Sequence, residues 1–106
     1  MPKYLIRARY EAEGAKGLIR EGGTGRRAAV IKATEALGGK LESFYYAFGE
    51  DDAYLIVDMP DQTSGLALSL AVNATGAIRL QTIPLITCEE IDAATQKTTS
   101  YRAPGA

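Results

Sequence analysis

Residues 40–59 read KLESFYYAFGEDDAYLIVDM, in which two runs of aromatic and branched side chains flank a glycine and three carboxylates. Aromatic and branched residues favour β-strands, and a short polar stretch with glycine is typical of the turn between two strands. The stretch therefore predicts a hairpin with strands over residues 40–48 and 53–59. We expect Gly49 to take a positive φ in this turn and Asp52 to accept hydrogen bonds from turn amides.

Five further elements surround the hairpin, each indicated by its pattern of apolar residues. Thr24, Asp61 and Thr87 are suited to cap the starts of helices, and Gly76 is suited to end one. The elements are a strand over residues 3–10, an interrupted helix over 11–38, a helix over 61–76, a strand over 77–86 and a short helix after Thr87. The order β-α-β-β-α-β predicts an α+β fold of the ferredoxin-like type, a four-stranded antiparallel sheet with two helices on one face.

Pairing Phe48 with Ala53 across the turn assigns each strand residue to a face of this sheet. One face then carries apolar side chains suited to lie beneath the helices, namely Phe44, Tyr46, Phe48, Ala53, Leu55 and Val57. The other carries a mixture from all four strands, namely Leu5, Arg7, Arg9, Ser43, Tyr45, Tyr54, Ile56, Asp58, Arg79, Gln81 and Ile83. Such a face is too apolar for water and too polar for a core, so we expect two copies to pack sheet to sheet as a dimeric α/β-barrel.

Composition limits the chemistry that is available. The 106 residues suffice for one domain, which we place at residues 1–97 with an extended tail over 98–106. There is no histidine, and the single cysteine, Cys88, excludes an intrachain disulfide and a cysteine-based zinc site. Cys88 falls in the first turn of a predicted helix, where we interpret it as a small, partly buried residue rather than a nucleophile.

Charge and hydropathy limit the partners. The 12 basic and 13 acidic residues are well mixed, so nucleic-acid binding is not expected. No apolar run is long enough to span a membrane, and the N-terminus lacks the pattern of a secretory signal. We expect a cytoplasmic protein without a cofactor, whose partners are its own copies and a small molecule.

The mixed face holds the best candidate for a binding site. Its three guanidinium groups face one carboxylate as the main counter-charge, which leaves a positive excess that could hold a carboxylate or phenolate ligand. Two tyrosines could stack on such a ligand or hydrogen-bond to it. Alternatively, these side chains pair with acidic residues of a second subunit. The candidate residues are Arg7, Arg9, Tyr45, Tyr54, Asp58 and Arg79.

Two other motifs favour structural roles. The consecutive acids Glu50–Asp52 could ligate a hard cation, but neighbouring turn residues point in different directions and no calcium-loop spacing is present. A solvated hairpin tip is the favoured interpretation, and Asp52 could reach Arg26 or Arg27 or cap a backbone group. The glycine-rich stretch GGTGRR, residues 22–27, could bind an anion at a helix start but is better interpreted as a helix break.

With these residues assigned, the chain resembles the GYD domain family of small bacterial proteins. The resemblance covers residues 1–95 and rests on the combination of PKYLIRARY, EGAKGLIREGGTGRRAAV, LGGKLESFYYAFGEDDAYLIVDMPD, ALSLAVNATGAIRLQTIPLIT and EEIDAA. The family is named for a Gly-Tyr-Asp element, commonly G-x-Y-D after the second strand. Here Gly49 and Asp52 match that element, and Asp51 stands in place of the tyrosine. The resemblance implies a ferredoxin-like fold and a bacterial cytosolic setting, but no particular chemistry.

Three hypotheses on function follow. The first is a self-associating GYD-type domain, a homodimer or larger homo-oligomer, that binds a small anionic or aromatic ligand. The second is a cofactor-independent monooxygenase or isomerase of the dimeric α/β-barrel type, by fold-level analogy. The third is a domain whose role is oligomerisation alone. A cavity lined by Arg7, Arg79 and Tyr54 would favour the first two, and a face filled by the partner's side chains would favour the third.

Overall fold

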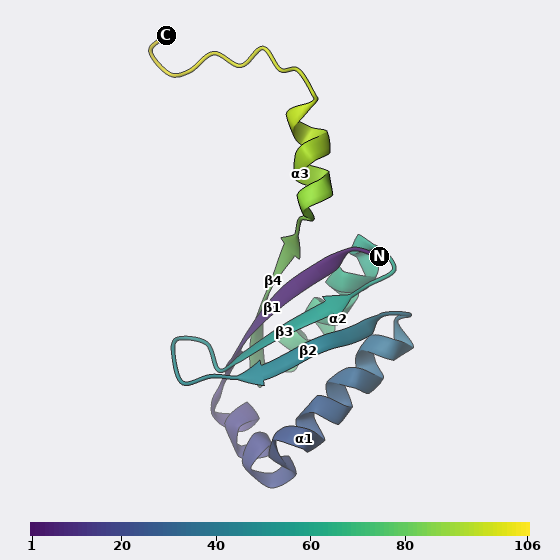
Figure 1. The fold of residues 1–106 in the computed structure, drawn as a ribbon. Helices are drawn as coiled ribbons and strands as arrows, with labels where there is room; N and C mark the ends of the chain where they lie inside the picture. The colour runs from purple at the N-terminus through teal and green to yellow at the C-terminus, as the bar shows by residue number, and fades with distance from the viewer.

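The protein is an α+β domain with one sheet. A computed structural model describes residues 1–106, and its strands form a four-stranded antiparallel sheet in the order β2-β3-β1-β4. Together with three helices, this arrangement confirms the predicted α+β class and is compatible with a ferredoxin-like fold (Figure 1). The elements are β1 (Lys3–Tyr10), α1 (Ala12–Ala36), β2 (Lys40–Tyr46), β3 (Ala53–Asp58), α2 (Gln62–Ala74), β4 (Ile78–Leu85) and α3 (Cys88–Thr95).

The two long helices cover the same face of the sheet. α1 packs mainly along β2 and α2 along β4, and Val30 of α1 and Leu68 of α2 both contact the core on that face. The predicted interruption of α1 occurs at Gly22, where φ is 77°. The helix resumes directly after this residue, so Thr24 lies inside the second segment and does not cap it, contrary to expectation. Asp61 caps α2 as predicted, because its side chain accepts a hydrogen bond from the Ser64 amide.

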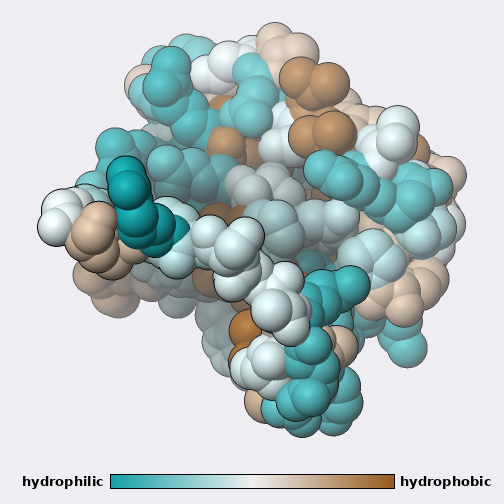
Figure 2. All heavy atoms as spheres, turned by 90° about the horizontal axis from the view of Figure 1, so that it is seen from above, coloured by the Kyte–Doolittle hydropathy of each residue, from teal (hydrophilic) through white to brown (hydrophobic).

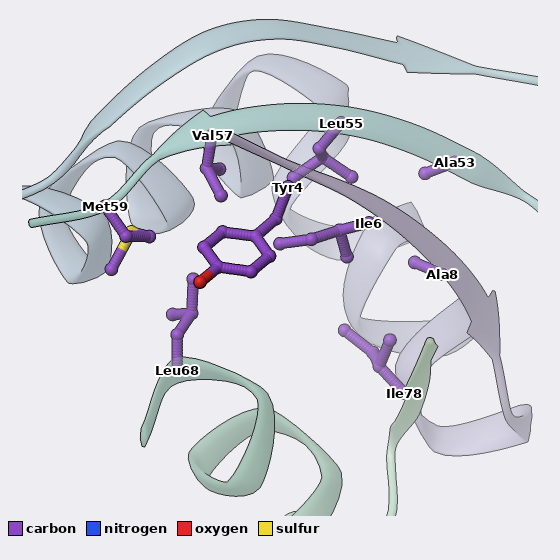
Figure 3. Packing of buried hydrophobic residues seen from close by; sticks show 9 residues of the cluster. All are labelled: Tyr4, Ile6, Ala8, Ala53, Leu55, Val57, Met59, Leu68 and Ile78. Atoms are coloured by element: carbon purple, nitrogen blue, oxygen red, sulfur yellow. The ribbon is translucent and has the colours of Figure 1, made fainter. Parts of the chain in front are cut away.

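The core is small and uneven. Figure 3 shows Tyr4, Val57, Met59 and Leu68 gathered at one end of the apolar cluster, with the ring of Tyr4 directed toward Leu68. The other end holds Ala8 and Ala53, with Ile78 below Ala8 (Figure 3). The nine buried apolar residues are Tyr4, Ile6, Ala8, Ala53, Leu55, Val57, Met59, Leu68 and Ile78.

The hairpin pairs two residues away from the predicted register. Tyr46, not Phe48, lies opposite Ala53, and β2 ends at Tyr46. Side chains alternate between the two faces of a strand with a period of two. A shift of two residues therefore leaves all the remaining strand residues on their predicted faces. Phe48 is the exception, since it lies in the loop with its side chain fully exposed, and its predicted core position is wrong.

The β2–β3 loop, residues 47–52, explains this register. The Ala47 amide donates to the Asp52 carbonyl at 2.9 Å, and the Asp52 amide donates to the Ala8 carbonyl at 2.8 Å. The loop therefore leaves the hairpin to bind the end of β1. A six-residue loop reverses the chain without a left-handed residue, so the predicted positive φ at Gly49 is wrong.

Beyond the sheet, the chain continues as a C-terminal arm, residues 86–106, that points away from the other elements (Figure 1). Every residue of the arm is exposed, although α3 is well capped by reciprocal hydrogen bonds between Thr87 and Glu90. The arm raises the radius of gyration to 17.0 Å, whereas a compact chain of this length has about 13 Å. No helix in the structure is both long enough and apolar enough to cross a membrane.

Candidate functional site

The face of the sheet opposite α1 and α2, here called the open face, carries the predicted mixture of side chains. Strand pairing places Tyr45 beside Tyr54, Tyr54 beside Arg7 and Arg7 beside Gln81, which makes one row across all four strands. The next row consists of Ser43, Ile56, Leu5 and Ile83. The open face therefore alternates a polar and aromatic row with an apolar one.

Arg7 is bound by a carboxylate of its own chain. Its Nε and Nη2 atoms lie 2.7 Å and 2.6 Å from Oδ2 of Asp51. The hydrogen bond from Nε, followed by the attraction of the Asp51 charge, raises the pKa of the Arg7 guanidinium. The Asp51 side chain is only 8% exposed because the β2–β3 loop lays it against β1. The predicted solvated tip is therefore wrong for Asp51.

The side chain of Asp52 attaches the same loop to the backbone of β1. Its Oδ2 accepts a hydrogen bond from the Tyr10 amide at 2.8 Å, at the last residue of β1. This agrees with the expected capping of a backbone group. The expected hydrogen bonds from turn amides and the alternative contact to Arg26 or Arg27 are not formed. The side chains of Asp51 and Asp52 thus both bind β1. Asp51 contacts the side chain of Arg7, and Asp52 contacts the backbone amide of Tyr10.

The other two arginines of the open face form looser ion pairs at its edge. Arg9 lies 3.5 Å from Glu50, and Arg79 lies 3.4 Å from Glu11, with all four side chains well exposed. Exposed pairs of this length contribute little to stability. Each of the three arginines nevertheless has a carboxylate of its own chain, so the expected positive excess is absent.

Asp58 does not serve as the counter-charge of the arginines, as had been expected. It lies at the opposite end of the sheet, where its Oδ1 accepts a hydrogen bond from Lys3 Nζ at 2.8 Å. Lys3 also contacts Glu42 at 3.1 Å. The hydrogen bond to Asp58, followed by the one to Glu42, raises the pKa of the Lys3 ammonium.

A groove of about 1180 Å³ runs from the arginine end of the open face around the edge strand β4. Arg7, Arg9, Arg79 and Gln81 line it together with the acids that pair with them. Tyr45, Tyr54 and Asp58 do not line it. The six predicted site residues thus share one face, but only the three arginines reach a common concavity.

The residues that sequence reasoning missed lie in the loop and on the covered face. Asp51 could have been found from the excess of arginines on β1, which required nearby acids. Tyr46 had no such signal. Its hydroxyl donates to the Gly23 carbonyl at 3.2 Å, and burial, followed by the proximity of Tyr10, raises the pKa of Tyr46 to about 12. Cys88 is exposed and not partly buried as expected.

The structure brings together no group of three or more His, Cys, Asp or Glu side chains that could hold a metal ion. Searches of the curated proteins and of the solved structures gave no match. The chain does match the model of the GYD domain over residues 4–95, which includes the sheet, both long helices and the loop that carries Gly49 and Asp52. The protein therefore belongs to the GYD domain family.

Proposed function

We propose that this GYD domain is a self-associating module in which two ferredoxin-like sheets pack through their open faces, as in a dimeric α/β-barrel. The observation that carries the proposal is the uncovered apolar surface of that face. Tyr45 is 72% exposed, Tyr54 38% and Ile83 37%, and all lie on strands that helices cover only from the other side. Large apolar side chains grouped on a regular surface are typical of an interface.

The charges of the open face are compatible with an identical partner. A twofold axis brings the same face of each copy together, so unpaired arginines would repel their counterparts. Here Arg7, Arg9 and Arg79 are each neutralised by a carboxylate of their own chain. Two copies can therefore approach without burying an uncompensated charge, which would be costly. Seen from the end that carries the C-terminal arm, the surface mixes hydrophobic and hydrophilic residues (Figure 2).

The test compares two exposed apolar residues on opposite sides of the sheet. Ile83 lies on the open face, and Leu70 lies on the outer surface of α2 with 69% exposure. Ile83→Glu should convert a dimer at micromolar concentration into a monomer, as measured by sedimentation equilibrium. Leu70→Glu should leave the dimer intact. A monomeric parent protein, or a dimer that only Leu70→Glu dissociates, would contradict the proposal.

A second candidate function is the binding of a small anionic ligand where the groove meets the partner. Arg79 favours this role because its side chain is 79% exposed and held by a single contact of 3.4 Å. A ligand carboxylate could replace Glu11 there at little cost. A native mass spectrum of the purified dimer should show a bound mass that Arg79→Ala removes without changing assembly. Arg20→Ala, on the surface of α1, is the control.

A further inference from the structure

A second hollow lies on the other face of the sheet, between α1 and α2. This interhelix groove has a volume of about 100 Å³. Ile6, Ala8 and Leu55 form its floor, with Ala33 of α1 and Val72 of α2 on its sides. Thirteen of its 14 lining residues are apolar, which leaves Arg26 as its single charged group.

The groove exists because small side chains meet at this end of the core. Ala8 and Ala53 lie opposite each other on β1 and β3, at the end of the cluster away from Tyr4 and Met59 (Figure 3). Above them, Ala29 and Ala33 are one helical turn apart on α1 and both line the groove. Both alanines remain exposed, so the gap they leave is open to solvent.

One end of the groove is polar. Arg26 lies one turn before Ala29 and Val30 on α1, and its only ion pair, to Glu21, is long at 3.5 Å. Tyr10 lines the groove as well. An apolar hollow with a few converging polar groups is the usual form of a small-molecule site.

We propose that the interhelix groove binds a small carboxylate with an apolar body about the size of one six-membered ring. The body would lie on Ala8 and Leu55 beside Ala33, and the carboxylate would contact the Arg26 guanidinium. The groove is smaller than the closed cavity of about 150 Å³ that accommodates benzene, so a ring would lie only partly inside it and extend through the opening beside Ala29 and Ala33. An α-helix about 10 Å across would not fit. The site lies on the opposite side of the sheet from the proposed dimer interface and does not depend on it.

The shape of the site is tested with benzoate as the probe and the full chain as the receptor. Titration should produce saturable shifts in the methyl NMR signals of Ala8, Ala33 and Leu55. Ala33→Leu should fill the groove and lower the affinity at least tenfold. Ala28→Leu, on the exposed side of the same helix, should bind benzoate as the parent does. Ala29→Leu provides a second filling variant, and thermal unfolding of each variant shows that it is folded.

The charge is tested separately. Arg26→Gln should weaken benzoate binding about tenfold, because a charge-assisted hydrogen bond is lost, while toluene binding stays the same. Arg27→Gln, the neighbouring arginine outside the groove, should change neither. The proposal fails if benzoate gives no saturable shifts at millimolar concentration, or if the filling variants bind it normally. It also fails if the shifts map to Arg79 and the open face, and that outcome would leave the ligand role proposed for the open face standing.

Discussion

Asp51 and Arg7 form the most buried ion pair of the protein. The carboxylate is 8% exposed and accepts a hydrogen bond from Arg7 Nε, while Nη2 lies 2.6 Å from the same oxygen, so the loop that carries Asp51 is held against β1. Glu50, next to it in sequence, is 79% exposed and contacts Arg9 at 3.5 Å. Asp51 therefore contributes more to the stability of the fold than Glu50 does, because only Asp51 is withdrawn from water.

This contrast predicts a difference in stability between two alanine substitutions. Asp51→Ala should lower the free energy of unfolding by about 1 kcal/mol, because it removes the hydrogen bond that a nearly buried carboxylate accepts from Arg7. Glu50→Ala should change it by less than about 0.5 kcal/mol. Urea denaturation of both variants measures the difference, and equal effects would show that the ion pair does not hold the loop.

The ionisation of Tyr46 should make the stability of the protein depend on pH in the alkaline range. Its pKa is raised from the ordinary 10.0 to about 12, chiefly because the phenol is partly withdrawn from water, although the residue as a whole is 40% exposed. The neutral phenol therefore contributes stability that is complete below pH 10 and is lost as the pH rises through about 12. In a spectrophotometric titration, Tyr46→Phe should remove the tyrosinate step near pH 12. Tyr45→Phe, at a neighbouring tyrosine that is 72% exposed, should leave that step in place.

At the scale of elements, the start of α1 is fixed to the entry of β4. The Glu11 amide donates to the Ala77 carbonyl at 2.9 Å, and Gly14 packs directly against the same carbonyl. A Cβ at Gly14 would overlap the Ala77 oxygen. One turn later, a Cβ at Gly17 would meet only Glu21 Oε1 at 3.9 Å, an ordinary contact.

Alanine at these two positions should have effects of opposite sign. Gly14→Ala should destabilise the protein by about 1–3 kcal/mol, since the helix must move away from the strand. Gly17→Ala should stabilise it by about 0.5–1 kcal/mol, because alanine loses less backbone freedom on folding than glycine. Thermal unfolding of the pair measures both shifts. A neutral Gly14→Ala would mean that α1 and β4 are not in close contact.

Helices and strands could be predicted because their sequence patterns are local. Contacts between residues that are far apart in the sequence could not. Alternation along each strand was enough to assign the faces, and the assignment survived a register error at Phe48 because only the parity of a position matters. The ion pair of Asp51 joins residues 44 apart in sequence, so no local pattern encodes it. The interhelix groove depends on how α1 and α2 sit over Ala8 and Ala53, which alanine content alone does not specify.

At the scale of the whole molecule, the C-terminal arm does not contribute to the stability of the sheet and its two long helices within one chain. No residue of α3 is buried. Deleting residues 87–106 should therefore leave the midpoint of thermal unfolding unchanged when the protein is dilute enough to be monomeric. A lower midpoint that appears only at concentrations where the parent dimerises would show that the arm packs on a partner.

The attachment of the β2–β3 loop to β1 also bears on the order of folding. The hairpin joins residues that are close in sequence, whereas Asp51 to Arg7 and Asp52 to Tyr10 close loops of 44 and 42 residues. Closing long loops costs more entropy, so we expect these contacts to form after the hairpin. Contacts absent from the transition state govern the rate of unfolding and not that of folding. Asp51 and Asp52 would then slow unfolding, and so lengthen the lifetime of the folded sheet once it has formed.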